Sequence, residues 1–266
     1  MPLNEVTDLE SFWRSRSTCW LISGPPNSGK TGSLPTFLEN DKERIAYVAY
    51  PGEEGAGTFP AQALGDRAKI WVGSDLSDPS KPVDWAAELR SVKQVTTDIL
   101  AGKHGAFDVF AGDGLHKLHG LFLAVATGGE SMKSYDFDAK CYGEAWKGFI
   151  QYLRLCFRSA GVRKKVWTIW DGREKDDPDA KDKDTQKHIF PELPGKGAKE
   201  IMGEFGVVVY ATVKGVAEGA RYEWQTKPFG KVWGCGIKAP VTVTKGVKTF
   251  VPQDYRVLAE QLGLRK

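Results

Sequence analysis

One octapeptide near the N-terminus restricts the fold more than any other part of the chain. Residues 24–31 read Gly-Pro-Pro-Asn-Ser-Gly-Lys-Thr, which matches G-x-x-x-x-G-K-T, and the apolar run Cys19-Trp20-Leu21-Ile22 precedes them. The run predicts a buried strand, and residues 33–38 predict the start of a helix. Glycines let consecutive backbone N–H groups point to one centre, where the start of a helix adds positive potential. The segment therefore predicts a phosphate-binding loop between a strand and a helix.

Two side chains of this segment have distinct expected roles. Lys30, expected to lie exposed in the loop, would neutralise phosphate oxygens, and the Thr31 hydroxyl would hold Mg²⁺. ATP with Mg²⁺ is therefore the predicted ligand. A chance match is the alternative, because the chain contains 30 glycines. The residues expected to surround the nucleotide are Gly24, Pro25, Pro26, Asn27, Ser28, Gly29, Lys30, Thr31 and Gly32.

The composition limits the class of protein without naming a function. The 266 residues are 41% hydrophobic and 27% charged, which suits one α/β domain with a substantial core. The net charge of +3 is compatible with binding nucleic acid and does not require it. The four cysteines form no C-x-x-C pair, and there is neither an apolar run of about 18 residues nor a signal peptide. We therefore expect a soluble, cytoplasmic protein with reduced thiols and no membrane contact.

Apolar runs alternate with helical patterns over the first two thirds of the chain. This alternation is typical of an α/β protein with a mainly parallel central sheet flanked by helices. The clearest helix contains Trp146, Phe149, Leu153 and Phe157 at three- and four-residue steps. The other elements expected here are strands at 44–50, 68–72, 107–113 and 165–170, and a helix within 83–100.

The pattern changes beyond residue 171. Residues 172–187 form a charge run with almost no apolar side chain, as expected of a solvated loop. Near the C-terminus two strand-like pieces have no helix between them, which favours an antiparallel extension. The elements expected in this part are a helix at 198–205, strands at 207–210, 221–226 and 231–237, and a last helix at 252–262 with Pro252 in its first turn.

The chain shows no internal repeat and no clear linker, so we expect one domain, 1–266. Its parts would be an N-terminal helix or arm (1–16), a nucleotide-binding core (17–215), and an antiparallel extension with a C-terminal helix (216–266).

Asp113 is the candidate acid that accompanies the loop. A carboxylate at the tip of a buried strand beside the loop can accept a hydrogen bond from a Mg²⁺-bound water, and Asp113 ends the apolar stretch 107–113. Asp108, at the other end of that strand, does not fit this placement. Asp113 could instead cap the helix that begins at 114–116. The two roles are compatible in one residue.

The residue that orients the attacking water is harder to identify. Asp113 is followed by Gly114, so the adjacent acid pair of many motor ATPases is absent. The loop after the predicted strand at 44–50 contains Glu53 and Glu54. A carboxylate there could orient water toward the γ-phosphate. Both glutamates could equally be solvated turn residues. We prefer Glu53 as the catalytic residue, acting with Lys30 and Asp113.

The order of these features resembles the RecA-like ATPase core. The features are the loop at 24–31, an acidic loop after the next strand, the Phe-Asp-x-x-x-x-Asp strand at 107–113, and a long helix before the 165–170 strand. Within that group the chain is most similar to compact phage-type ATPases that act as RecA/RadA-type recombination or single-strand-annealing proteins. The resemblance covers residues 17–262, and only the loop is highly specific.

The resemblance implies an enzyme that hydrolyses ATP with Mg²⁺, self-associates into rings or filaments and acts on single-stranded DNA. The family's polar sensor of the γ-phosphate falls at Trp170 and Asp171. Trp170 departs from that pattern, so sensing would either rest on Asp171 or be weakened. The remaining matches are Lys30 and Thr31 to the phosphate and magnesium ligands, Asp113 to the second acid, and Glu53 to the water-activating glutamate.

Positive residues in two predicted loops are the candidate DNA contacts implied by the resemblance. They are Lys133, Arg173, Lys175 and Lys187. Aspartates in the same charge run nearly cancel its positive charge, so a solvated face is the alternative. Lys238 is the first choice for a cation that a neighbouring subunit would contribute to the γ-phosphate, with a simple surface lysine as the alternative.

Two functions from other classes compete with a DNA-dependent ATPase. A small-molecule kinase would share the loop, but it should have an arginine-rich lid, and the run at 172–187 has only Arg173. A regulatory or structural nucleotide-binding protein without DNA activity is the stronger competitor, because the sequence does not fix the catalytic carboxylate.

Overall fold

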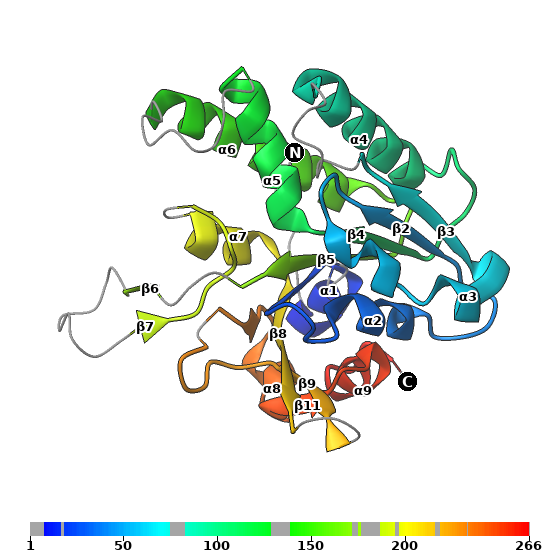
Figure 1. The fold of residues 1–266 in the computed structure, drawn as a ribbon. Coiled ribbons are helices and arrows are strands. Elements are labelled where there is room, and N and C mark those ends of the chain that lie inside the picture. The colour runs from blue at the N-terminus through cyan, green and yellow to red at the C-terminus, as the bar shows by residue number, and fades with distance from the viewer. Residues whose placement is uncertain are drawn as a thin grey trace.

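The structure is a computed structural model, and its central feature is a sheet with helices on both faces (Figure 1). In the part that it describes, this sheet has nine strands. No helix in that part has the length and apolarity needed to cross a membrane. The described residues are 8–16, 19–74, 83–128, 139–171, 175–176, 187–194, 197–215, 219–232 and 234–265.

The sheet is parallel in its centre and antiparallel at one side. Its strands are β1 (Cys19–Gly24), β2 (Ile45–Ala49), β3 (Ala68–Val72), β4 (Val109–Asp113), β5 (Lys164–Trp170), β8 (Val207–Lys214), β9 (Arg221–Gln225), β10 (Gly236–Ile237) and β11 (Phe250–Pro252). Their order is β11-β9-β8-β1-β5-β4-β2-β3, with β10 paired to β8. All pairs from β8 to β3 are parallel, whereas β9 and β10 run antiparallel to β8. The predicted α/β class with an antiparallel C-terminal extension is confirmed.

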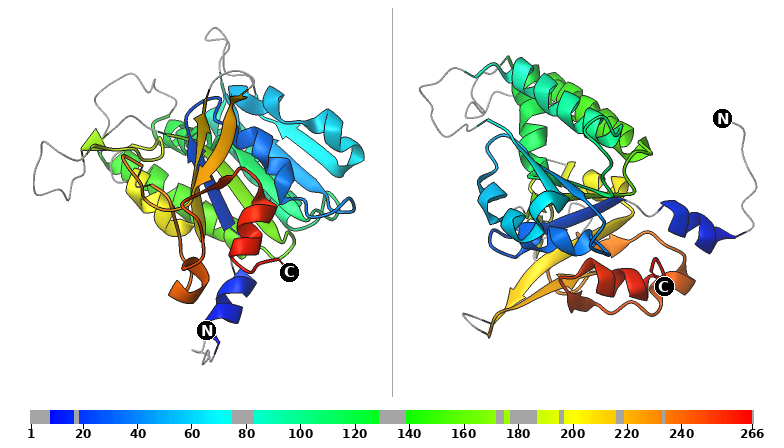
Figure 2. Two further views of the ribbon diagram at one scale, coloured as in Figure 1. Left: turned by 90° about the horizontal axis from the view of Figure 1, so that it is seen from below. Right: turned by 90° about the vertical axis from the view of Figure 1, so that its right-hand side faces the viewer.

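Helices form a layer on each face of the sheet, as the views in Figures 1 and 2 show. The helices are α1 (Leu9–Arg16), α2 (Lys30–Ser33), α3 (Ala61–Leu64), α4 (Trp85–Leu100), α5 (Leu115–Ala126), α6 (Ala139–Arg158), α7 (Gly197–Glu204), α8 (Val241–Thr244) and α9 (Tyr255–Gln261), with short 3₁₀ turns η1 (Leu34–Phe37), η2 (Glu54–Thr58) and η3 (Gly65–Arg67). Residues of α4, α5, α6 and α7 share one core cluster, and those of η1, α8 and α9 share another. A two-stranded hairpin of β6 (Lys175–Asp176) and β7 (Lys187–His188) stands apart.

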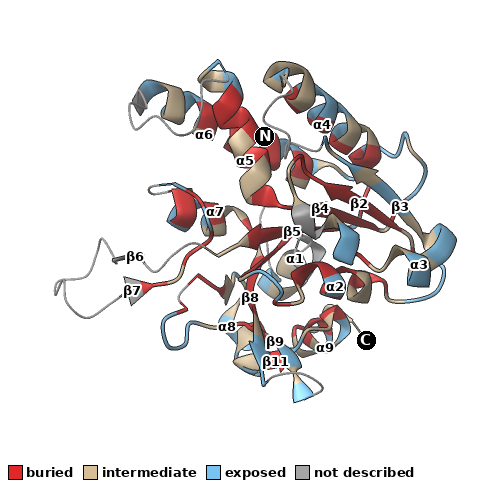
Figure 3. Cartoon of the chain, in the orientation of Figure 1, coloured by how far each residue is buried: buried red, intermediate tan, exposed pale blue. Residues whose placement is uncertain are grey.

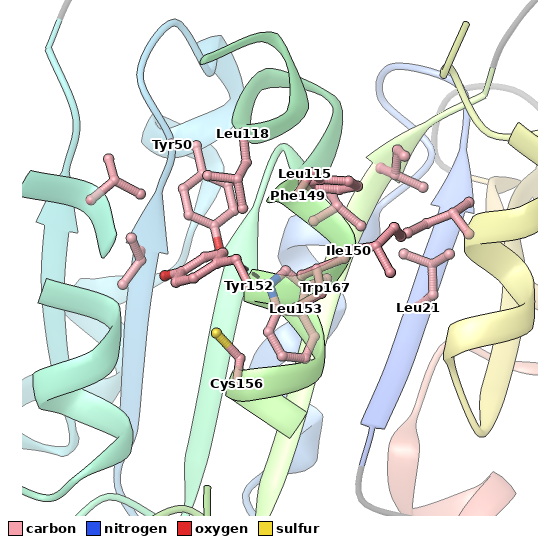
Figure 4. Packing of buried hydrophobic residues seen from close by; sticks show 14 of the residues in the cluster. Leu21, Tyr50, Leu115, Leu118, Phe149, Ile150, Tyr152, Leu153, Cys156 and Trp167 are labelled. Carbon is pink, nitrogen blue, oxygen red and sulfur yellow. Dashed lines mark hydrogen bonds between the residues drawn. The ribbon is translucent and has the colours of Figure 1, made fainter. Parts of the chain in front are cut away.

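The central strands are buried on both sides, which is why they read as continuous apolar runs. In β1, Leu21 packs in the α4–α7 layer while Trp20 and Ile22 pack in the opposite layer, as the two-residue period of a strand requires. Every residue of β1 is buried, and Figure 3 shows the burial of β4 and β5. Figure 4 shows the first layer from close by, where the Trp167 ring nitrogen donates to the Tyr50 hydroxyl at 3.1 Å.

Helix α1 lies outside these two layers in both views of Figure 2. Its Trp13 packs against the second core cluster and donates a hydrogen bond to the carbonyl oxygen of Lys238.

Three predicted element boundaries were wrong for identifiable reasons. The helix after the loop begins at Lys30, not at residue 33, and tightens into η1 because Pro35 has no N–H for a further α-helical bond. Pro252 belongs to β11, and α9 begins later, where the Asp254 side chain accepts from the backbone N–H of Arg256 at 2.9 Å. Of the predicted strand 231–237, only Gly236–Ile237 pairs with the sheet, because the chain turns back between Phe229 and Val232.

Candidate functional site

The loop at 24–31, called the P-loop below, connects β1 to α2. Gly29 has φ of 83° and Asn27 has φ of 61°, both in the left-handed region. A Cβ on Gly29 would lie 2.7 Å from the Tyr222 ring and from Gln253 Oε1, so glycine is required for space as well as for conformation. Because α2 starts immediately after Gly29, its free N–H groups face the loop.

Lys30 is buried in the P-loop instead of being exposed as expected. Only 6% of the residue is accessible, and its Nζ donates to the carbonyl oxygens of Gly24 at 2.8 Å and Pro25 at 2.6 Å. Burial lowers the pKa of Lys30, and the negative charges of Asp113 and Glu53 partly oppose that shift. The side chain is therefore held at the loop by main-chain oxygens and not by a carboxylate.

Asp113 ends β4 and is bound by three hydroxyl groups from three other elements. Its Oδ2 accepts from Thr31 Oγ1 at 2.9 Å and from the Tyr47 hydroxyl at 2.5 Å, and its Oδ1 accepts from Thr168 Oγ1. The carboxylate is 2% exposed. Thr31 and Asp113, both predicted to lie at the phosphate-binding loop, are therefore in contact in the structure.

Asp113 does not cap the following helix. Gly114 is the N-cap residue of α5, and no side chain gives it a cap hydrogen bond. The Gly114 N–H instead donates to Thr168 Oγ1 at 3.1 Å. Thr168 thus joins the end of β4 to β5, and the Asp113 side chain is left to face the P-loop.

The sequence did not identify Tyr47 and Thr168 as residues of the site. Each lies inside a strand of apolar residues, so the only signal is a hydroxyl within a buried run. Burial raises the pKa of the Tyr47 phenol, and the neighbouring Asp113 charge and hydrogen bond raise it further. Tyr47 is therefore a neutral donor to the carboxylate, with its ring stacked on Phe59 at 4.2 Å between centroids.

A cavity of 790 Å³ opens over the P-loop. Glu53, Asp113 and Trp170 line one flank, whereas Tyr222 and Gln253 line the other. This arrangement follows the sheet order, because β2, β4 and β5 lie on one side of β1 and β8, β9 and β11 on the other. The remaining lining residues are Pro26, Asn27, Ser28, Gly29, Lys30, Thr31, Gly32, Ser33 and Thr58.

Glu53 lies in this cavity with Lys30 and Asp113, as the sequence predicts for a catalytic glutamate. The backbone N–H of Glu53 donates to the Tyr50 carbonyl at 2.9 Å, which fixes the turn after β2. A Cβ on Gly114 would collide with the Glu53 carboxylate, so this glycine leaves room for it. Glu54 begins η2, and its side chain lies outside the described structure.

Gln253 binds the P-loop from the C-terminal side of the chain. Its Nε2 donates to the Ser28 carbonyl at 2.7 Å and also contacts the carbonyl oxygens of Glu223 at 3.2 Å and Thr212 at 3.4 Å. One side-chain amide therefore connects the loop to β8 and β9. No local pattern predicts this contact, because Gln253 belongs to no motif.

The two residues at the expected sensor position differ in their surroundings. The Asp171 carboxylate accepts from the Tyr210 hydroxyl at 2.8 Å, and Asp171 does not line the cavity. Trp170 does line it, with its ring 4.9 Å from that of His116 and 5.2 Å from the ammonium group of Lys117. The role proposed for Asp171 as a sensor stays a prediction.

The candidate cations lie away from the P-loop cavity or outside the described residues. Lys133 and Arg173 lie outside them, and Lys175 and Lys187 are described only in their backbone, in the β6–β7 hairpin. Lys238 follows β10, whose partner residues are at the start of β8, so it is at the sheet edge opposite the P-loop. Its Nζ donates to the Gly203 carbonyl, and a role in a neighbouring subunit stays a prediction.

Comparison with known proteins gives a likeness of fold only. No protein-family model matches the chain, and neither does any curated protein. A KaiC-like protein from the hyperthermophilic archaeon Pyrococcus horikoshii matches at 13% identity and a TM-score of 0.39, over 79% of this chain and 78% of that one. An ATPase from the type III secretion system of pathogenic bacteria matches at 9% identity and a TM-score of 0.49, over 78% of this chain and 56% of that one.

The sheet order and the loop together define the class of fold. The chain has an α/β fold with a P-loop between its first sheet strand and the helix that follows. The acid-bearing strand β4 is separated from β1 by β5, and its Asp113 nevertheless reaches the P-loop threonine.

Proposed function

We propose that this protein binds a nucleoside triphosphate with Mg²⁺ in the P-loop cavity and hydrolyses it. The observation that carries the proposal is the hydrogen bond between Thr31 Oγ1 and Asp113 Oδ2, 2.9 Å long, beside the buried Lys30. A hydroxyl and a carboxylate in contact at the start of a helix are the two protein groups that a phosphate-bound Mg²⁺ requires.

The residues of the loop fit a triphosphate. Ser28 Oγ is buried and has no hydrogen-bond partner among the described residues, so a polar group is available at the loop centre. The described residues also contain no cluster of three or more His, Cys, Asp or Glu side chains that could hold a metal ion. A site with one hydroxyl and one carboxylate suits Mg²⁺, which takes its other ligands from phosphate and water.

Each residue of the site has a definite role in this proposal. Lys30 is the cation for the β- and γ-phosphates, and Thr31 and Asp113 hold the metal ion. When bound, Mg²⁺ supplies positive charge that stabilises the phosphate oxygens during transfer. Glu53 orients the attacking water from the same flank of the cavity. Tyr47 and Thr168 hold the Asp113 carboxylate in its position.

The test compares Lys30→Ala with Lys69→Ala, a change of an exposed lysine on the edge strand β3. We expect Lys30→Ala to lower ATP affinity or turnover by roughly two orders of magnitude, because it removes a charged contact to phosphate. Lys69→Ala should behave like the wild type. Unchanged Mg²⁺-dependent turnover in a folded Lys30→Ala protein contradicts the proposal, and binding without turnover in the wild type favours a nucleotide-dependent regulator.

We further propose that the ATP-bound protein self-associates and binds single-stranded DNA in recombination, annealing or repair. The resemblance to RecA-like ATPases suggests this activity. The end of β5 supports it, because Trp170 lines the P-loop cavity and the next residue, Asp171, forms a bridge with Pro191. Arg173 and Lys175 follow Trp170 by three and five residues in the sequence, and together with Lys187 they are candidate DNA contacts. Lys133 is the further candidate contact.

The assay for this second proposal measures sedimentation and ATP turnover with and without an oligonucleotide. We expect DNA to raise turnover, and affinity to fall as salt rises because phosphate contacts release counterions. Replacing Arg173 and Lys175 together should weaken DNA binding more than basal hydrolysis. A protein that stays monomeric and neither binds nor responds to DNA contradicts this activity and leaves the nucleotide site standing.

A further inference from the structure

The two flanks of the P-loop cavity have different chemistry. The flank formed by β2, β4 and β5 contributes Glu53 and Asp113, which carry the negative charge. The opposite flank contributes Tyr222 from β9 and Gln253 after β11, neither of which is charged. If the metal and the reacting phosphate lie with the carboxylates, the uncharged flank at Tyr222 is the side that remains for the sugar and base.

Tyr222 lines the cavity with its ring against the loop. A Cβ built on Gly29 would lie 2.7 Å from Tyr222 Cδ1 and 3.2 Å from Cε1, so the ring edge touches the glycine backbone. The residue is nevertheless 48% exposed. A half-exposed aromatic ring fixed at one edge leaves a face open, which is the geometry of a stacking surface.

The Gln253 amide on the same flank does not remain available to read the edge of a base. Its Nε2 donates to main-chain oxygens of the loop and of β8 and β9, and its Oε1 lies against Gly29. On this flank, recognition of a base by these two residues therefore depends on contact with the Tyr222 ring. Every base has an aromatic face that can make such a contact.

We propose that the Tyr222 ring is the surface on which the base of the bound nucleotide stacks. This inference rests on the proposed nucleotide function and deepens it. It assigns the direction of the nucleotide across the sheet, with the phosphates toward β4 and the base toward β9. It also assigns a binding contribution that depends on the ring and not on the identity of the base.

The experiment measures binding of non-hydrolysable ATP and GTP analogues and of inorganic tripolyphosphate, all with Mg²⁺, to Tyr222→Ala and Tyr222→Phe. We expect Tyr222→Ala to weaken both analogues by the same factor of roughly tenfold and Tyr222→Phe to retain the affinity, because stacking needs only the ring. Tripolyphosphate affinity should not change. Phe229→Ala, a change of another exposed ring that does not line the cavity, is the matched control.

Several outcomes overturn the proposal. An equal loss for tripolyphosphate would mean that the ring supports the P-loop through Gly29 and does not contact the base. Unchanged analogue affinity in Tyr222→Ala, or a loss confined to one base, also contradicts stacking. Each of these outcomes contradicts base stacking but not the proposed phosphate site. A wild-type protein that binds neither the analogues nor tripolyphosphate contradicts the nucleotide function itself.

Discussion

Thr31 and Asp113 are 82 residues apart in the sequence, and the hydroxyl of the first donates to the carboxylate of the second at 2.9 Å. Their strands, β1 and β4, are not neighbours in the sheet, because β5 runs between them. The contact is possible because parallel strands bring their carboxyl ends to one edge, where α2 begins directly after Gly29. The candidate metal site therefore depends on the sheet order.

Replacing Asp113 with asparagine should separate binding from hydrolysis. Asp113→Asn keeps the size of the side chain but removes the negative charge, so we expect nucleotide binding to persist in part and Mg²⁺-dependent turnover to fall by roughly a hundredfold or more. Asp108→Asn is the control, because Asp108 directly precedes β4, at the end of the strand away from Asp113, and accepts from the Arg44 N–H at 3.0 Å. Turnover and nucleotide titrations check both, and equal losses would indicate a structural effect.

The two glutamates after β2 should differ in their effect on turnover. Glu53→Gln removes a carboxylate that lines the cavity, so we expect turnover to fall by about 10²- to 10⁴-fold with nucleotide affinity kept. Glu54→Gln is predicted to be nearly silent. Single-turnover kinetics with a separate binding measurement checks this, and the water-orienting role is wrong if neither change slows turnover.

Tyr47 should influence the metal site through Asp113. Tyr47→Phe removes one donor to a buried carboxylate, so we expect the free energy of unfolding to fall by about 1.5–3 kcal/mol. The Mg²⁺ concentration needed for half-maximal turnover should also change. Tyr50→Phe is matched in size and burial but contacts Trp167 instead, so it should lower stability without changing the Mg²⁺ dependence. Identical Mg²⁺ titrations for both variants would mean that Tyr47 does not influence the metal site.

Stability should decrease on mild acidification because of His119. Burial lowers the pKa of this imidazole to about 4, against an unfolded value of 6.5, and the ring is enclosed by Tyr142, Trp146 and Phe149. Between these values the unfolded state binds the proton and the folded state does not, so the free energy of unfolding falls as the pH falls. The expected loss by about pH 5 is about 2 kcal/mol.

The measurement for His119 is urea unfolding at about pH 7.5 and about pH 5, for the wild type and for His119→Phe. Phenylalanine keeps the ring among its aromatic neighbours and removes the titrating group, so the variant should lose less stability between the two conditions. The same loss in both proteins would assign the pH dependence to other groups.

Much of the fold could be predicted because the buried strands are short apolar runs between helical patterns. The strands β1 to β5 appear at the predicted places, and the helices α4, α6 and α7 lie within a few residues of theirs. The errors fall where one residue decides a boundary. Pro35 shortens α2, and Asp254 rather than Pro252 marks the start of the last helix, as its N-cap residue.

Residues of the candidate site could be predicted only where a local sequence pattern identifies them. The P-loop is contiguous, and Asp113 follows from its place at the end of a buried strand. Tyr47, Thr168, Tyr222 and Gln253 reach the same region from separate elements, and nothing in their local sequence marks the contact. Such residues become visible only when the sheet order is known, because long-range pairing decides which strand ends lie together.

The hydrogen bond from Gln253 to the Ser28 carbonyl joins residues 225 positions apart. During synthesis the P-loop leaves the ribosome well before the side chain that binds it. A nascent chain would therefore contain the loop before it contains the Gln253 side chain that binds the loop. The position of the loop therefore depends on a side chain made 225 residues later, and a fragment that lacks residue 253 would contain the loop without this hydrogen bond.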